Sequence, residues 1–329
     1  MPNPLNCMGK KECKIDSKNT AADFETAAPD TAEVQAGGFP TWLDLVAMIV
    51  IFLLATLVGG SCMLIMKRAA PGMEQELVNV VTYGVQFVLA IGGVWVYRAA
   101  RGASGSPFRF AFKWYNSSLV LLGIVLIAAV SIAIEPLVNA FPEHWFERLN
   151  AAIGRGGWAI LMTVVLAPVF EEMLFRGLIL ESMRRKWGAS AAIVVSAALF
   201  GLVHAPILPQ MLNAFVMGVI LGYIYVLTDS LLSVIVIHAV NNGLAYMLLE
   251  ITGDQATDVR AMLGNDTVWW IVYAASLVVS VAALVSMAVI ATDRMRKRAE
   301  IAAVFNEASA EEKEEETLPS EEGENNNKE

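Results

Sequence analysis

Residues 158–183 read WAILMTVVLAPVFEEMLFRGLILESM, and this stretch decides the fold class of the chain. A helix needs about 20 mostly apolar residues to cross a bilayer, and the stretch is longer than that. Because hydrocarbon offers no hydrogen-bonding partners, a helix is also the structure that satisfies its own backbone there. We therefore expect a transmembrane helix with Glu171, Glu172 and Arg176 near its middle.

The rest of the chain has the same character. Of its 329 residues, 56% are hydrophobic and 17% are charged, and the mean hydropathy is +0.55. A water-soluble core could not bury so much apolar surface. We predict an all-α, polytopic integral membrane protein with about eight transmembrane helices, near residues 43–66, 77–97, 118–139, 158–183, 189–205, 208–227, 230–250 and 268–292. The fifth is short enough to stop inside the membrane.

The basic residues predict the orientation. An even number of crossings puts both termini on one side, and Lys and Arg favour cytoplasmic loops. Eleven basic residues would lie on the side of the termini and five on the other side. The eleven are Arg98, Arg101, Arg109, Lys113, Arg184, Arg185, Lys186, Arg294, Arg296, Lys297 and Arg298. We expect both termini in the cytoplasm and the protein in the plasma (inner) membrane.

Composition divides the chain into five parts. We expect a disordered polar leader at 1–42, N-terminal transmembrane helices at 43–139, a catalytic helical core at 140–250, a loop and last transmembrane helix at 251–292, and a basic then acidic disordered tail at 293–329. The leader has no apolar core of a signal peptide. Residues 307–329 contain ten Glu, which account for most of the formal net charge of -9.

The composition supports neither nucleic-acid binding nor a disulfide-stabilised fold. The chain has no basic excess that would attract nucleic acid. Its three cysteines, Cys7, Cys13 and Cys62, are an odd number and do not suggest a disulfide framework. We assign these cysteines no role.

Ionisable side chains in the middle of a membrane helix are costly, about 2.5–3.5 kcal/mol each, and usually mark a function. Glu172 and Arg176 are four residues apart, so they lie on one helix face and can form an ion pair. Glu171 lies about 100° around the helix from Glu172 and out of easy reach of Arg176. It needs another partner, and such a carboxylate suits a general base.

Two of the three histidines lie in or beside hydrophobic segments. His204 follows Phe200 by four residues, so both share a helix face. His238 and Asn242 have the same spacing and present an imidazole and an amide on one face, as a pair of hydrogen-bond donors would be arranged. Membrane segments rarely carry such side chains without a function.

These three motifs, Glu171-Glu172-x-x-x-Arg176, Phe200-x-x-x-His204 and His238-x-x-x-Asn242, occur in this order on successive hydrophobic segments. Together they resemble the CAAX-protease and bacteriocin-processing (CPBP, or ABI) family of intramembrane endopeptidases, which includes the Ras-converting CAAX prenyl endopeptidases. The resemblance covers roughly residues 155–250.

The resemblance implies peptide-bond hydrolysis. It implies that Glu171 and His204 activate a water molecule, with Glu172 beside them in the catalytic motif, and that His238 and Asn242 form an oxyanion hole. It leaves the metal question open, because Glu171, His204 and His238 could ligate Zn²⁺ although the chain has no His-Glu-x-x-His motif. The expected substrates are membrane-associated, with CAAX-type C-termini or bacteriocin-like leader peptides.

Two other functions stay open at this point. Intramembrane Glu and His also mark proton- or metal-ion-coupled transporters, but we find no internal repeat of the kind many transporters contain. A non-catalytic peptide-binding or immunity protein with the same motifs is the other alternative. The expected partners are a peptide or protein substrate, which a lipid group would anchor in some cases, and membrane lipids. The sequence does not give the oligomeric state.

Overall fold

The computed structural model describes residues 39–101, 110–252 and 259–317. These residues form helices joined by turns, with no strand among them, which confirms the predicted all-α class. The elements are α2 (Trp42–Ala69), α3 (Gln75–Ala100), α4 (Ser117–Val138), α5 (His144–Ile153), α6 (Gly157–Ile160), η3 (Leu161–Leu166), α7 (Ala167–Glu172), η4 (Met173–Leu180), α8 (Glu181–Trp187), α9 (Ala189–Leu202), α10 (Leu208–Thr228), α11 (Leu231–Thr252), α12 (Val259–Leu263) and α13 (Asp266–Thr317).

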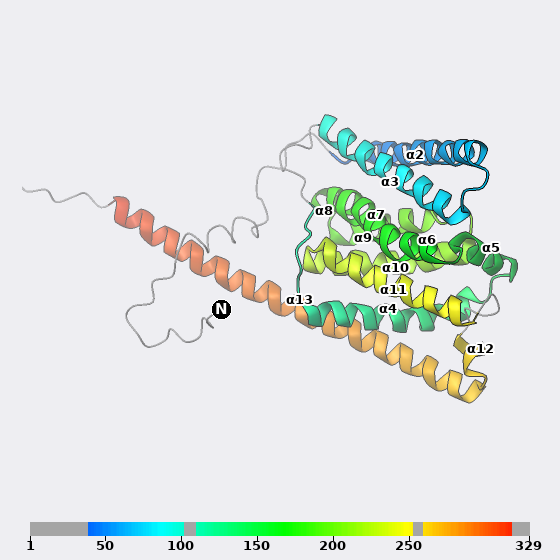
Figure 1. Cartoon of the computed structure of the whole chain (residues 1–329). Coiled ribbons are helices and arrows are strands. Elements are labelled where there is room, and N and C mark those ends of the chain that lie inside the picture. Colours follow the sequence, from blue (N-terminus) through cyan, green and yellow to red (C-terminus); the bar gives the residue numbers. More distant parts are fainter. Residues whose placement is uncertain (1–38, 102–109, 253–258, 318–329) are drawn as a thin grey trace, which may run out of the picture. The chain divides into compact units, whose positions relative to one another are not determined.

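Seven helices of the described residues are long and apolar enough to cross a membrane, and α9 is an eighth, shorter apolar helix. Their positions agree with the eight predicted segments, and the protein is an integral membrane protein. With 14 residues, α9 is about 21 Å long, so it is shorter than the hydrocarbon layer of about 30 Å. Figure 1 shows that the seven long spans and α9 pass back and forth in alternating directions.

Elements α6, η3, α7, η4 and α8 form one continuous span, Gly157–Trp187, which we call the glutamate helix. It contacts α3, α9 and α11 along its length. On the other side of the bundle, α4 packs against α10, α11 and α13. The helices next to the glutamate helix therefore include one, α3, that lies far from it in the sequence (Figure 1).

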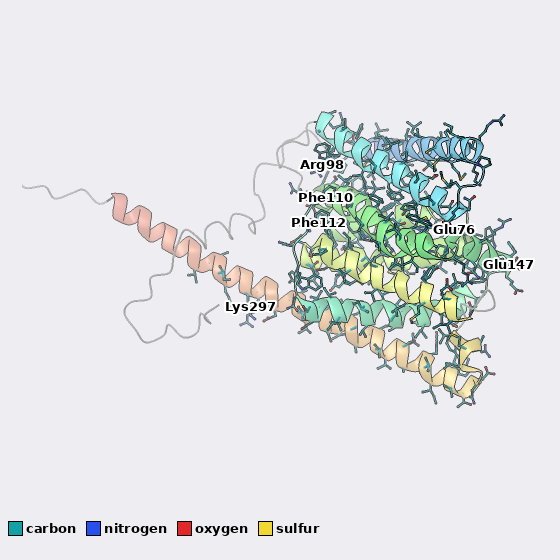
Figure 2. The ribbon with its side chains drawn as sticks, in the orientation of Figure 1. Glu76, Arg98, Phe110, Phe112, Glu147 and Lys297 are labelled. Carbon is teal, nitrogen blue, oxygen red and sulfur yellow. The ribbon has the colours of Figure 1, made fainter. Side chains whose placement is uncertain are left out.

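Charged and aromatic residues gather at the two ends of the bundle. Figure 2 shows Arg98 and Lys297 toward one end and Glu76 and Glu147 toward the other. At the first end, Asp229 adopts a left-handed backbone conformation with a φ of 47°. Arg184 donates a hydrogen bond of 2.6 Å to the Asp229 carboxylate. This contact joins α8 to the turn between α10 and α11.

The last helix is longer than the sequence predicts. The composition predicts a disordered tail at 293–329, whereas α13 continues beyond the membrane span to Thr317. The extension is rich in Ala, Glu, Lys and Arg, which favour helices, and ion pairs at four-residue spacing support it. They join Lys297 to Asp293 at 2.8 Å and Arg296 to Glu300 at 3.1 Å. The leader at 1–38 and residues 318–329 lie outside the described residues.

Candidate active site

The glutamate helix changes its hydrogen-bonding register on both sides of its two acids. Glu171 and Glu172 end the short α7, which lies between the π-helical elements η3 and η4. Such wider turns are rare and often occur at functional sites. In η3 the N–H of Ala167 bonds to the carbonyl of Met162, five residues earlier. In this register the carbonyl of Thr163 would be paired with residue 168, which is a proline without an N–H.

Asn242 on α11 supplies the donor that Pro168 lacks. Its Nδ2 donates a hydrogen bond of 3.0 Å to the Thr163 carbonyl. Its Oδ1 accepts a hydrogen bond of 3.3 Å from Asn241. One hydrogen of the Asn242 amide therefore fastens α11 to the glutamate helix, and the second remains for another acceptor.

Glu172 and Arg176 form the contact that their helical spacing predicts. Arg176 Nη1 lies 2.8 Å from Glu172 Oε1, and the two side chains are 1% and 0% exposed. Arg176 Nη2 donates to the Gly218 carbonyl at 3.2 Å, and its guanidinium lies over the Phe200 ring at 4.7 Å. A Cβ on Gly218 would meet Ala197 Cα at 2.9 Å, so a glycine is needed where α9 and α10 meet.

His238 lies between the two glutamates. Its Nδ1 is 2.8 Å from Glu172 Oε1, and its Nε2 is 3.8 Å from Glu171 Oε2. Because Glu172 Oε1 also accepts from Arg176, the carboxylate is the acceptor and His238 Nδ1 is the donor. Glu172 therefore holds both Arg176 and His238, a link that the sequence analysis did not include.

His204 lies in the turn between α9 and α10, just beyond the end of α9. Its Nδ1 is 2.8 Å from the Phe200 carbonyl, which can only accept, so Nδ1 is the donor. In the neutral ring, Nε2 then carries the lone pair. The predicted four-residue spacing of Phe200 and His204 thus sets the ring's tautomer.

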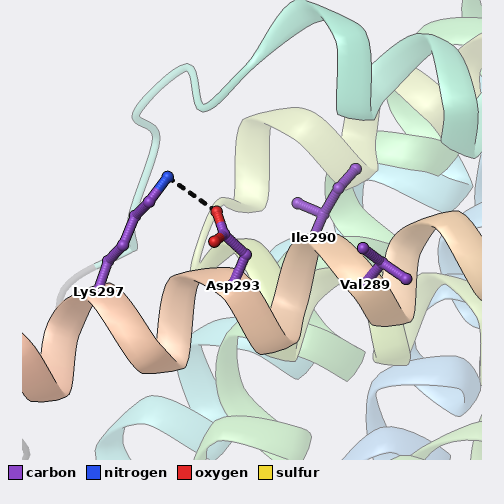
Figure 3. A pocket seen from close by; sticks show the side chains of 4 residues that line it. All are labelled: Val289, Ile290, Asp293 and Lys297. Carbon is purple, nitrogen blue, oxygen red and sulfur yellow. Dashed lines mark ion pairs between the residues drawn. The ribbon is translucent and has the colours of Figure 1, made fainter.

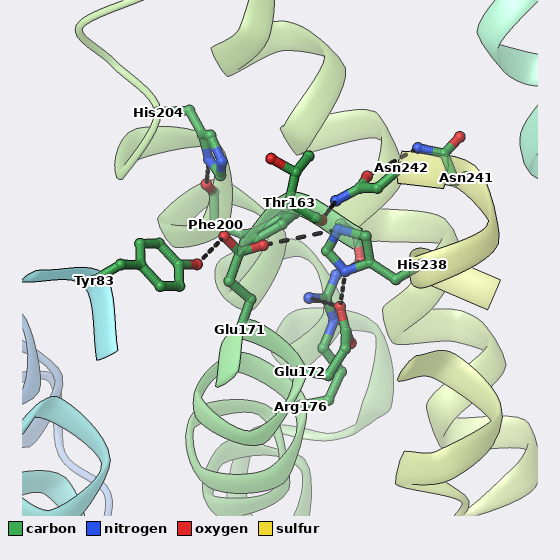
Figure 4. Close-up of polar contacts among 11 residues, drawn as sticks. Tyr83, Thr163, Glu171, Glu172, Arg176, Phe200, His204, His238, Asn241 and Asn242 are labelled. Carbon is green, nitrogen blue, oxygen red and sulfur yellow. Dashed lines mark hydrogen bonds and ion pairs between the residues drawn. The ribbon is translucent and has the colours of Figure 1, made fainter. Parts of the chain in front are cut away.

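Glu171 has a partner that the sequence analysis missed. The hydroxyl of Tyr83, on α3, donates a hydrogen bond of 2.7 Å to Glu171 Oε1. Glu171 is 7% exposed, and Figure 4 shows Tyr83 reaching it from the side opposite His238. The only sequence signal for Tyr83 is a polar hydroxyl within an apolar segment, which many buried tyrosines share.

A cavity of about 130 Å³ brings the predicted site residues together. It has room for several water molecules. Its lining contains four of the five predicted catalytic residues, while Glu172 lies behind it. The lining residues are Tyr83, Met162, Thr163, Ala167, Glu171, Phe200, His204, Gln210, Asn213, Ala214, Met217, His238, Asn241 and Asn242.

A wider hollow of about 670 Å³ lies beside α13, away from these residues. It is lined by Val289, Ile290, Asp293 and Lys297, and its two charged side chains are paired with each other (Figure 3). It contains no histidine, and none of the predicted site residues lines it. We therefore take the smaller cavity as the candidate active site.

The cavity does not present a metal-ligand set. Among the described residues, no group of three or more His, Cys, Asp or Glu side chains is arranged to hold a metal ion. The combination of Glu171, His204 and His238, which the sequence left open for zinc, is therefore not among such groups.

One comparison with known proteins gives a match over part of the chain. A family model described as "Type II CAAX prenyl endopeptidase Rce1-like" matches residues 154–244. This range contains the glutamate helix, His204, His238 and Asn242. Tyr83 lies outside it. No curated protein and no solved structure matches the chain.

Proposed function

We propose, on the premise that residues 154–244 match the type II CAAX prenyl endopeptidase Rce1-like family, that the protein hydrolyses peptide bonds of membrane-associated substrates within the bilayer. The family is one of peptidases that act on peptides in membranes. The observation that carries the proposal is the cavity in which Glu171, His204, His238 and Asn242 meet.

In the proposed mechanism, Glu171 and His204 hold the attacking water. The water donates one hydrogen to the Glu171 carboxylate and the other to Nε2 of His204, so its oxygen lone pairs are directed away from both. As the oxygen bonds to the substrate carbonyl carbon, Glu171 takes the proton. Glu171 then delivers that proton to the departing amide nitrogen as the carbon–nitrogen bond breaks. No step in this sequence requires a metal.

We propose that His238 and Asn242 donate hydrogen bonds to the oxyanion of the tetrahedral intermediate. Asn242 has one amide hydrogen that its bond to Thr163 does not use. His238 can donate from Nε2 when its ring is protonated, with Nδ1 still bonded to Glu172. One well-placed donor of this kind lowers a barrier by about 3–4 kcal/mol. Glu172 and Arg176 act behind the site and keep His238 in place.

The membrane setting favours lipidated or membrane-anchored substrates. We propose peptides with a prenylated CAAX-type C-terminus as the first class, with bacteriocin-like leader peptides as the second. We also propose that both termini face the cytoplasm and that the protein lies in the plasma membrane, because basic residues are more numerous on the side of the termini. Residues 140–250 would form the catalytic core.

The test uses the full-length protein in liposomes with a panel of prenylated CAAX peptides and leader peptides. We expect the parent to cleave at least one class, and Glu171→Gln and His204→Ala to lower the rate by at least about 10²-fold. His144→Ala and Glu147→Gln are the matched controls, since both residues lie on α5 with exposed side chains, and they should cleave like the parent.

Two results would count against the proposal. If Glu171→Gln and His204→Ala cleave as fast as the parent, the assigned residues do not carry the reaction. If no peptide is cleaved but the liposomes show ion flux that Glu171→Gln abolishes, the intramembrane acids belong to a transporter instead.

A further inference from the structure

Tyr83 is the residue of the site that lies farthest from the others in the sequence. It is on α3, 88 residues before Glu171, and outside the family-matched range 154–244. Its hydroxyl nevertheless donates a hydrogen bond of 2.7 Å to Glu171 Oε1, and the residue lines the same cavity (Figure 4).

A stack of aromatic rings determines where the Tyr83 hydroxyl lies. The ring of Tyr83 stacks on that of Phe87, one turn further along α3, with a centroid distance of 4.5 Å. Phe87 in turn stacks on Phe170 at 6.1 Å. Phe170 immediately precedes Glu171 on the glutamate helix. The same contact that joins α3 to α7 therefore also sets the distance between the hydroxyl and the carboxylate.

The hydrogen bond makes the two oxygens of Glu171 different. Oε1 accepts from Tyr83, whereas Oε2 lies 3.8 Å from His238 Nε2. A carboxylate held at one oxygen cannot rotate freely, so the other oxygen stays in a defined direction. A displacement of about 1 Å at a reacting group can cost about 10²-fold in rate.

Resting on the proposed function, we propose that Tyr83 is a positioning residue, which holds Glu171 by Oε1 so that Oε2 is the oxygen that takes the proton from water. The catalytic unit then extends beyond the family-matched region to α3. The role of α3 in this unit is to provide one hydroxyl at a defined place.

The chain offers a matched control on the same helix. Tyr97 donates a hydrogen bond of 2.8 Å to Asp44, which is also a contact between a tyrosine hydroxyl and a buried carboxylate. Asp44 belongs to the capping box at the start of α2 and accepts from Arg101 as well. Tyr97→Phe therefore removes the same kind of hydrogen bond, about 21 Å along α3 from Tyr83.

The test compares Tyr83→Phe with Tyr97→Phe in the full-length protein. We expect Tyr83→Phe to lower kcat about 10- to 100-fold, with KM within twofold and a melting temperature in detergent no lower than that of Tyr97→Phe. Tyr97→Phe should keep the kcat of the parent. The proposal would be overturned if the kcat of Tyr83→Phe lay within twofold of that of the parent. It would also be overturned if Tyr83→Phe and Tyr97→Phe lowered kcat equally.

A second measurement does not depend on cleavage. The infrared carboxylate band that disappears in Glu171→Gln belongs to Glu171, and it should shift in Tyr83→Phe but not in Tyr97→Phe. An unchanged band in Tyr83→Phe would contradict the proposal. A parent that cleaves no peptide contradicts the proposed function, and the band still decides whether Tyr83 holds Glu171.

Discussion

The ion pair of Glu172 and Arg176 also orients a neighbouring side chain, His238. Two opposite charges buried in a membrane helix cost solvation energy, and only good geometry and further hydrogen bonds repay that cost. Here Glu172 Oε1 accepts hydrogen bonds from both Arg176 and His238. Arg176 also bonds to the Gly218 carbonyl and lies over Phe200. The pair therefore orients the proposed oxyanion donor as well as neutralising its own charge.

Removing one member of this pair should unfold the protein more readily. Arg176→Ala leaves the Glu172 carboxylate buried without its cation, and we expect a loss of about 3–5 kcal/mol in the free energy of unfolding. The measurement is reversible unfolding in mixed micelles, with the folded yield as a second readout. Arg296→Ala breaks a pair with the same spacing that is exposed, so it should change stability by at most about 0.5 kcal/mol. Equal stabilities of the two variants would refute this account of the buried pair.

At the scale of elements, a single proline explains a contact between two helices. Pro168 removes the donor that the π-helical register would offer to the Thr163 carbonyl, and Asn242 replaces it from α11. The wide turns before and after α7 also set the direction in which Glu171 and Glu172 project. The irregularity of the glutamate helix is thus part of how the site is built.

This account predicts that the effects of two substitutions depend on each other. Asn242→Leu alone leaves the Thr163 carbonyl without its partner and should cost about 1–3 kcal/mol of stability. In a Pro168→Ala background, the new N–H of residue 168 can donate a hydrogen bond to the Thr163 carbonyl. The same Asn242→Leu change should therefore cost less stability in that background.

A double-mutant cycle of thermal or denaturant unfolding measures this coupling. Additive effects would show that the missing donor of Pro168 does not determine the role of Asn242. Cleavage should be low in both proteins that carry Asn242→Leu, since the proposed oxyanion donor is absent from both.

At the scale of the whole molecule, α13 has two parts with different surroundings. Between Asp266 and Asp293 it packs on α4 and buries Trp269, Ala283 and Met287. Beyond Asp293 the described side chains of Arg296, Ile301 and Val304 are exposed. The extension is therefore a helix that owes its stability to its own composition and pairs.

Shortening the chain should separate these parts. A protein that ends after Asn306 should cleave the same peptides as the full chain, because it keeps the whole packed part of α13. A protein that ends after Leu263 loses all contacts of α13 with α4, and we expect it to be recovered unfolded or degraded. Cleavage rates and folded yields in liposomes check both outcomes, and a loss of cleavage in the first protein would assign a function to the acidic end.

The lining of the candidate active site includes a helix outside the family-matched residues 154–244. Four separate parts of the chain meet at the cavity, namely α3, the glutamate helix, the segment made of α9, the following turn and α10, and α11. The family model covers all of these except α3. Helix α3, which precedes residue 154, therefore contributes Tyr83 to the candidate site.

The sequence by itself determined the features that depend on neighbours along the chain. Long apolar runs predict the membrane helices, because lipid forces the backbone to satisfy itself. Helical spacing predicts the contact between Glu172 and Arg176, and three ordered motifs indicate the family. The helical extension of α13 was missed because its charges suggested a solvated tail, although the same residues favour a helix.

Only the tertiary structure decided which distant groups share a hydrogen bond. The contacts of Tyr83 with Glu171, His238 with Glu172 and Asn242 with the Thr163 carbonyl join residues that are 88, 66 and 79 positions apart. No helical period relates such positions, because packing between helices sets their relative rotation and depth. The sequence thus identified the paired glutamates, and packing gave each glutamate its own partner.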